Sequence, residues 1–198
     1  MGRLDHDSGT TGAQARVIGP DGRLYVASES TDSVLRFDLP TYAYLDTFVT
    51  PGSGGLNGPT GLVFDARGDL LVGSFETDEV LKYDGRSGAP LGAFVRAGDG
   101  GLNGPDTGMT MGPDGNLYVP SFWNHRVLRY DGATGAFTDT FIPASSEVLK
   151  LPRVVRFRDD YSSVVDAGRS KPNQHDAVTA VFVKSEVEGS GLGRPKGE

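Results

Sequence analysis

Residues 112–130 read GPDGNLYVPSFWNHRVLRY, and this stretch occurs three times in the chain in related form. The earlier copies are GPDGRLYVASESTDSVLRF at residues 19–37 and DARGDLLVGSFETDEVLKY at residues 65–83. Each copy has a glycine at the same turn position, and these glycines, 46 and 47 residues apart, are Gly22, Gly68 and Gly115. A fixed period of this length is the sequence signature of a repeat architecture. We therefore interpret the chain as a tandem array of one small unit.

Each unit contains short runs in which apolar and polar residues alternate, as in strands with one buried face. Asp-Gly and Pro-Asp-Gly sequences separate the runs and favour tight turns, because glycine adopts positive φ without steric cost. The runs predict four strands per unit, at residues 13–19, 23–28, 33–38 and 44–49, then 59–65, 69–74, 79–84 and 91–96, then 107–112, 116–121, 126–131 and 137–142. The sequence therefore predicts an all-β protein.

The composition narrows the classes of function. The 198 residues carry a formal net charge of −7 and include no cysteine. An acidic chain is a poor ligand for phosphate backbones, so we expect no nucleic-acid partner. No apolar run is long enough to span a bilayer. Residues 1–12 form a polar lead-in without the apolar core of a secretory signal, which favours a cytoplasmic protein as the sequence is written. The compartment stays unknown, because an extracytoplasmic location remains open if an N-terminal part is missing.

The third copy relates the chain to known families. Residues 124–131, NHRVLRYD, resemble the Asn-His-Leu signature of NHL repeats, and the preceding Gly-x-Leu-Tyr-Val line is similar to streptogramin B lyases and to gluconolactonase-like proteins. Four strands in about 46 residues are also what one blade of a β-propeller requires. The resemblance therefore implies a β-propeller of four-stranded blades over residues 13–142.

The remainder, residues 143–198, is divergent and poorer in glycine. We expect the repeat to stop near Phe141, with two strands within residues 153–165, another within 177–187, and a disordered end at 189–198. Three blades are fewer than the about four to eight that close a propeller. Three explanations remain open. The tail forms a partial fourth blade, two chains close a six-bladed ring as a homodimer, or the chain is a truncated or frame-shifted part of a longer protein.

The resemblance implies that the loops between the second and third strands lie on one face of the propeller, together with the links between blades. These loops differ most between the copies, and variable loops on a constant scaffold often carry binding. Our candidates for ligand binding are Phe75, Phe122, Trp123 and Asn124. The aromatic residues would form a platform for a protein or a small molecule. Alternatively, their rings pack between blades.

His125 has three interpretations. In the NHL signature this position is largely structural and supports the loop before the third strand. His125 is also our candidate catalytic residue, as the general base of a lyase-like site, and a metal ligand is the third alternative. Its counterparts in the other copies are Asp32 and Asp78. All three residues can accept a hydrogen bond from backbone, which favours the structural role.

Carboxylates are the candidates for a metal site. The resemblance to gluconolactonase-like proteins implies a divalent metal in the central funnel, Mg²⁺ or Ca²⁺, and such cations require several converging oxygen ligands. Our candidates are Asp106, Glu29 and Glu76. Asp106 is the one residue that lengthens the repeat from 46 to 47, at the entry to a strand. A tolerated loop insertion is the alternative explanation.

Two functions are consistent with these patterns. The first is an NHL-like propeller that acts as a binding or interaction scaffold through its loop face. The alternative is a divalent-metal-dependent lyase or lactone hydrolase with its site in the funnel. The sequence leaves open whether the protein is an enzyme, because the copies are regular and no convergent catalytic set stands out.

Overall fold

The computed structural model describes residues 12–144, 149–158, 161–166 and 179–183. Within them, three antiparallel sheets of four strands form the regular part of the protein, and each strand pairs with the next along the chain. The lead-in, except for Gly12, and the expected disordered end lie outside the described residues.

The sheets are named blades in chain order. Blade one contains β1 (Ala13–Ile18), β2 (Leu24–Ser28), β3 (Ser33–Phe37) and β4 (Tyr44–Val49). Blade two contains β5 (Pro59–Phe64), β6 (Leu70–Ser74), β7 (Glu79–Tyr83) and β8 (Pro90–Val95). Blade three contains β9 (Thr110–Met111), β10 (Leu117–Ser121), β11 (Arg126–Tyr130) and β12 (Phe137–Ile142). The predicted all-β class is confirmed. The described residues also form short 3₁₀ turns, η1 (Glu29–Thr31), η2 (Ser53–Gly55), η3 (Phe75–Thr77) and η4 (Asp99–Gly101).

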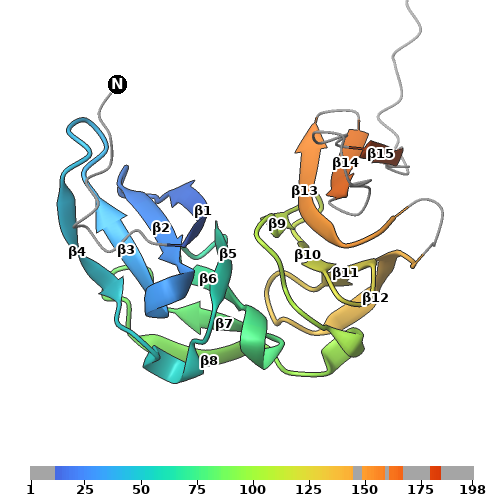
Figure 1. The fold of residues 1–198 in the computed structure, drawn as a ribbon, viewed down its shortest axis with the longest axis horizontal. Coiled ribbons are helices and arrows are strands. Elements are labelled where there is room, and N and C mark those ends of the chain that lie inside the picture. Colours follow the sequence, from blue (N-terminus) through green and yellow to red (C-terminus); the bar gives the residue numbers. More distant parts are fainter. Residues whose placement is uncertain (1–11, 145–148, 159–160, 167–178, 184–198) are drawn as a thin grey trace, which may run out of the picture.

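A fourth sheet follows blade three and contains β13 (Pro152–Arg158), β14 (Tyr161–Asp166) and β15 (Thr179–Val183). The four sheets succeed one another around an open arc, with β1, β5, β9 and β13 on its inner side (Figure 1). The structure thus differs from the expectation that the repeat stops near Phe141. Leu149 to Pro152 occupy the place of Leu56 to Pro59, and Leu149 is fully buried, as Leu56 nearly is.

The apolar core lies between the sheets, because a single blade cannot bury both of its own faces. Tyr25 and Val34 of blade one pack with Leu70 and Tyr83 of blade two in one buried cluster. The corresponding cluster joins blades two and three, and Val155 of the fourth sheet packs in a third cluster with residues of blade three. The turns agree with the sequence, since Gly68 and Gly115 have φ of 83° and 78°. Stacking of blades therefore builds the core.

The inner strand of blade three is the main departure from the repeat. The sequence predicts a strand at 107–112, whereas β9 spans only Thr110–Met111. The residue inserted at Asp106 enlarges a bulge that begins at the bridge between Pro105 and Ser121. The bulged Gly108 instead pairs in parallel with Val154 of β13, donating its N–H to the Arg153 carbonyl at 2.8 Å. The insertion thus joins blade three to the fourth sheet through backbone hydrogen bonds.

Among the described residues, no helix is long and apolar enough to cross a membrane.

Candidate functional site

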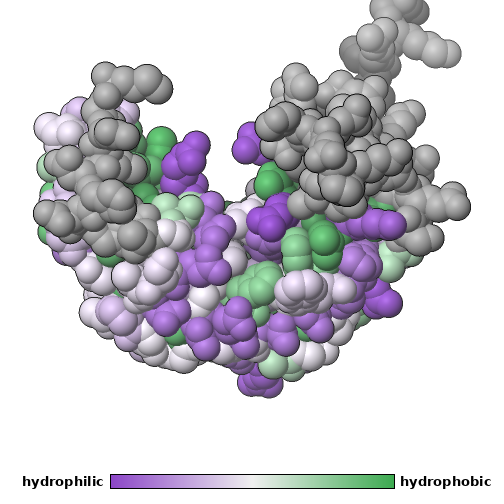
Figure 2. All heavy atoms as spheres, viewed as in Figure 1, coloured by the Kyte–Doolittle hydropathy of each residue, from purple (hydrophilic) through white to green (hydrophobic). Residues whose placement is uncertain are grey.

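The loop face of the arc is formed by the loops between the second and third strands of each blade and by the links between blades. These segments are joined by backbone, since the N–H groups of Phe75 and Phe122 donate to the carbonyls of Gly58 and Gly104, each at 3.0 Å. The ends of the arc leave a hollow, bordered by hydrophilic side chains together with a few apolar ones (Figure 2). Loops of neighbouring blades therefore meet beside a concave surface, where binding sites are commonly found.

Three aromatic rings from two blades gather on this face. The centroids of Phe122 and Trp123 are 4.8 Å apart and nearly perpendicular, and the Phe75 centroid lies 6.0 and 6.2 Å from them. Gly104 allows this approach, because a Cβ there would lie 2.9 Å from both the Phe75 and the Trp123 rings. Phe122 is buried, whereas Trp123 is 58% exposed. The rings thus pack between blades, as one interpretation expected, and still present an exposed aromatic surface.

Arg153, at the start of β13, lies over this aromatic cluster. Its guanidinium carbon is 5.2 Å from the Phe122 ring centroid, within the range of a cation–π contact. Its nearest acidic partner is Asp106, at 3.9 Å from Nε, and the Arg153 side chain is 47% exposed. Within the described part of the chain, the Arg153 guanidinium donates no hydrogen bond, and the ion pair with Asp106 is its one polar contact. Among the described residues, the two terminal amino groups of the guanidinium therefore have no partner and could bind a ligand that reaches the ring surface.

Asp106 lies below Arg153 and is only 3% exposed. Its carboxylate accepts a hydrogen bond from the N–H of Thr107 at 2.6 Å. Burial raises the pKa of Asp106, and this effect outweighs the lowering effects of Thr107 and Arg153. Glu29 of blade one adds the smallest contribution, in the raising direction. Shifted pKa values are frequent among the ionisable groups of functional sites.

Asn124 completes the set. Its Nδ2 donates to the Gly101 carbonyl at 2.5 Å. In the part of the chain that the structure describes, its Oδ1 is the one buried side-chain polar atom without a hydrogen-bond partner. A buried acceptor without a donor is costly, so a donor supplied by a ligand would stabilise the folded protein. We name the following residues the loop-face cluster: Phe75, Phe122, Trp123, Asn124, Asp106 and Arg153.

His125 forms a contact that its repeat counterparts also form. Its Nδ1 accepts a hydrogen bond from the N–H of Leu151 at 3.0 Å. At the equivalent places, Asp32 and Asp78 accept from the N–H groups of the following blade's link at 2.7 Å. All three residues have positive φ, between 47° and 58°. His125 thus connects blade three to the segment that leads into the fourth sheet. Its catalytic role stays a prediction.

The three predicted metal ligands do not come together as a group. Glu76 is exposed on η3, and Glu29 accepts a hydrogen bond from the Gln14 side chain. Within the described ranges, no three His, Cys, Asp or Glu residues lie close enough together to hold a metal ion. A Mg²⁺ or Ca²⁺ site takes about six or more oxygen ligands, so further ligands would be needed beside these residues. Their metal role stays a prediction.

Sequence reasoning missed Arg153, because the repeat was expected to end before it. The signal was present as a spacing of leucines that precede proline at the links. Leu56 and Leu102 are 46 residues apart, and Leu149 follows 47 residues later, also three residues before a proline. That alignment places Arg153 on the first strand of a fourth unit, next to the loop face.

Comparisons with known proteins identify the fold. No protein-family model and no curated protein sequence matches the chain. Among solved structures, hydrazine synthase of Kuenenia stuttgartiensis is 18% identical with a TM-score of 0.65, over 92% of this chain and 48% of that one. Virginiamycin B lyase of Staphylococcus aureus is 12% identical with a TM-score of 0.61, over 94% and 59%. A gluconolactonase of Xanthomonas campestris is 14% identical with a TM-score of 0.67, over 89% and 60%.

These similarities confirm the predicted β-propeller fold of four-stranded blades. The chain spans only about half to three fifths of the length of these proteins, with coverages of 48%, 59% and 60%. At such low identity the similarity establishes the fold and not the chemistry.

Proposed function

We propose that the protein is a propeller binding module that holds a ligand on its loop face. The ligand is a peptide segment or a small molecule that presents an apolar ring beside a carboxylate. The observation that carries this proposal is the position of Arg153, half-exposed over the Phe122 ring and beside the exposed Trp123. Aromatic surface supplies contact area at low entropic cost, and a guanidinium with free donors binds a carboxylate in a fixed geometry.

The polar groups of the loop-face cluster support this ligand class. Arg153 is the nearest cation to the ring surface, and its loose 3.9 Å contact with Asp106 leaves its donors available to an anion. An N-acylated aromatic amino acid carries an aromatic ring and a carboxylate on one small molecule, and it is therefore a suitable probe.

The alternative is a divalent-metal-dependent lyase or lactone hydrolase with its site in the central funnel. It is favoured by the fold similarity and by the buried Asp106 carboxylate. The described residues lack the further ligands that a metal would need. A second copy of the chain could supply them by closing a ring with the first, and light scattering of the purified protein tests this association directly.

The binding proposal can be tested with Trp123, the only tryptophan in the sequence. We expect N-acetyl-L-phenylalanine to change the Trp123 emission saturably at millimolar or lower concentration. The matching amide, which lacks the carboxylate, and the Arg153→Gln variant should each bind about tenfold more weakly. Leu91→Ala is the matched control, because Leu91 is 55% exposed on the outer strand β8.

The same titration separates the two functions. Binding that occurs in the presence of a chelator supports the binding module. A change that appears only after Mg²⁺ or Ca²⁺ is added would favour the metal-dependent alternative. No saturable change under either condition, with the protein folded, would overturn the proposed binding function.

A further inference from the structure

A pocket of about 370 Å³ lies between blades two and three, on the face opposite the loop face. The turns between first and second strands and between third and fourth strands surround it, and Phe64 and Met111 form its apolar walls. The remaining lining residues are Asp65, Ala66, Arg67, Gly115, Gly132 and Ala133. Its volume is at the lower end of the range for small-ligand sites, about 300–1,000 Å³. None of the loop-face cluster borders it.

The neighbouring junctions explain why this pocket exists. Between blades one and two, the Tyr25 ring packs edge-on against Phe64, with centroids 5.1 Å apart. Between blade three and the fourth sheet, the equivalent Tyr118 packs on Phe157 at 4.7 Å. In blade two, the same position of the repeat is Leu71. The junction with the shorter side chain therefore lacks the phenol ring that the other two contain.

A second substitution accompanies the first. Gly19 and Gly112 precede the turns of blades one and three, and a Cβ at either position would lie 2.5 Å from the adjacent tyrosine ring. Blade two has Asp65 there instead, which is compatible only with the shorter Leu71. The Asp65 carboxylate is satisfied within its own blade, by Lys82 Nζ at 2.7 Å and by the N–H groups of Arg67 and Asp69 at 2.9 Å. The pocket wall therefore presents no unpaired negative charge.

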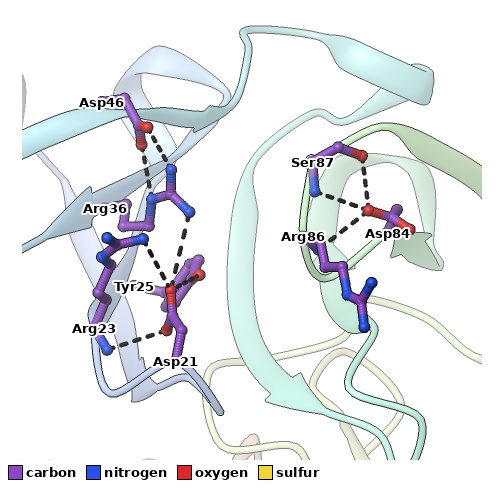
Figure 3. A network of polar contacts seen from close by, with 8 residues as sticks. All are labelled: Asp21, Arg23, Tyr25, Arg36, Asp46, Asp84, Arg86 and Ser87. Atoms are coloured by element: carbon purple, nitrogen blue, oxygen red, sulfur yellow. Dashed lines mark hydrogen bonds and ion pairs between the residues drawn. The ribbon is translucent and has the colours of Figure 1, made fainter.

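The residue that meets the tyrosine hydroxyl in blades one and three is an anion, whereas blade two has a cation at that repeat position. The Tyr25 hydroxyl donates to Asp21 at 3.1 Å, as Figure 3 shows, and the Tyr118 hydroxyl donates to Asp114 at 2.9 Å. The repeat position of these aspartates is Arg67 in blade two. The described residues offer the exposed Arg67 guanidinium no hydrogen bond or ion pair. A ring in this pocket would thus meet a cation where the tyrosine hydroxyls meet an anion.

We propose that this pocket binds a small aryl carboxylate. The aromatic ring lies in the pocket between Phe64 and Met111, and the carboxylate pairs with Arg67. A guanidinium binds a carboxylate through two parallel N–H···O bonds, so the anion is preferred over a neutral hydroxyl. The proposal is independent of loop-face binding, since it depends on different residues on the other face.

The test uses 4-methylbenzoate and p-cresol, which carry a carboxylate and a hydroxyl on the same ring. Ligand-observed NMR and calorimetry on the full chain should show that 4-methylbenzoate binds about tenfold more tightly than p-cresol. Arg67→Asp, which restores the residue of blades one and three, should abolish this preference or reverse it. Ala133→Phe should block both ligands by filling the pocket, and the repeat counterpart of Ala133, Arg86, shows that this turn accepts a long side chain.

Controls make the result specific. Arg153→Gln should leave binding of 4-methylbenzoate unchanged, because Arg153 belongs to the loop-face cluster. If Arg67→Asp does not fold, Arg67→Gln removes the charge with less change and should weaken 4-methylbenzoate selectively. The proposal is overturned if 4-methylbenzoate does not bind the folded protein, if it binds no better than p-cresol, or if Ala133→Phe and the Arg67 variants bind it as well as the parent does.

Discussion

Blades two and three each bury one aspartate next to an inner strand, and the two carboxylates differ in how far neighbouring groups compensate their charge. Asp65 is 8% exposed and forms one ion pair and two backbone hydrogen bonds that compensate its charge. Asp106 is 3% exposed and has one backbone N–H donor from its neighbour and a distant guanidinium. Burial raises the pKa of both groups, but the partners of Asp65 bring its pKa below the ordinary value, whereas that of Asp106 stays raised.

The partners of the two aspartates indicate different roles for the two positions. Asp65, at the turn end of blade two, is part of a closed network with Lys82 and Asp69 and has no capacity left for a ligand. Asp106, at the loop-face end of blade three, keeps an incompletely compensated charge beside aromatic rings. Natural proteins accept such local costs mainly where binding or catalysis benefits. The loop face is therefore the part of the scaffold on which we propose that a ligand binds.

The largest loss of stability is expected when Asp65 loses its charge partner Lys82, so that its charge is left as poorly compensated as that of Asp106. Lys82→Met removes the buried cation, and the Lys82 side chain is only 14% exposed. Because the Asp65 carboxylate loses its charge partner inside the protein, the free energy of unfolding should fall by about 3–5 kcal/mol. Urea denaturation measures this loss.

Arg129→Met is the matched control in blade three. Arg129 occupies the repeat position of Lys82, and its carboxylate partners Asp139 and Asp114 have side chains that are 44% and 37% exposed. Loss of a pair that is open to solvent should cost about 0–1 kcal/mol. Equal losses for the two variants would contradict the distinction between the buried network and the exposed pair.

The second prediction uses asparagine at both positions, and the effects should have opposite signs. Asp106→Asn should raise the free energy of unfolding at neutral pH by about 1 kcal/mol, because it removes a buried charge. Asp65→Asn should lower it by about 2 kcal/mol or more, because it leaves Lys82 without that partner. Denaturation at a series of pH values measures both.

The pH dependence follows from the direction of each pKa shift. The pKa of Asp106 is raised, so its ionisation costs stability as pH rises from the ordinary aspartate range, about pH 4, through the raised value. The gain in Asp106→Asn should therefore vanish below about pH 4. The pKa of Asp65 is lowered, so its stabilisation is present above the ordinary range and is lost as pH falls through the lowered value. The loss in Asp65→Asn should shrink in acid. A pH-independent difference for either variant would contradict the assigned shift.

The smallest loss of stability is expected when the hydrogen bond between Leu151 and His125 is removed. His125→Ala removes the acceptor of the Leu151 N–H and should cost about 1 kcal/mol. His125→Asp introduces the residue of the other two blades and should cost less, since Asp32 and Asp78 accept the equivalent N–H groups. Thermal unfolding compares the two variants. If aspartate were no better than alanine, His125 would not form the connection that its counterparts form.

The candidate site was predictable only in part. The loops that supply Phe75, Phe122, Trp123 and Asn124 stand out in the sequence because they vary while their flanks repeat. Arg153 did not stand out, since it follows a link that has lost the Asn-Gly of the earlier links. The pocket at Arg67 was also hidden, because the residues that line it belong to turns of two blades that meet only at a blade junction.

The sequence by itself determined the repeat, the all-β class and the position of each turn, because strand alternation and glycine turns are local properties of a few adjacent residues. Only the tertiary structure decided which side chains meet between blades. It placed Arg153 over Phe122, joined Gly108 to Val154, and left a pocket between Phe64 and Met111. These contacts join segments that are tens of residues apart, and their geometry depends on how whole sheets stack, which periodicity does not specify.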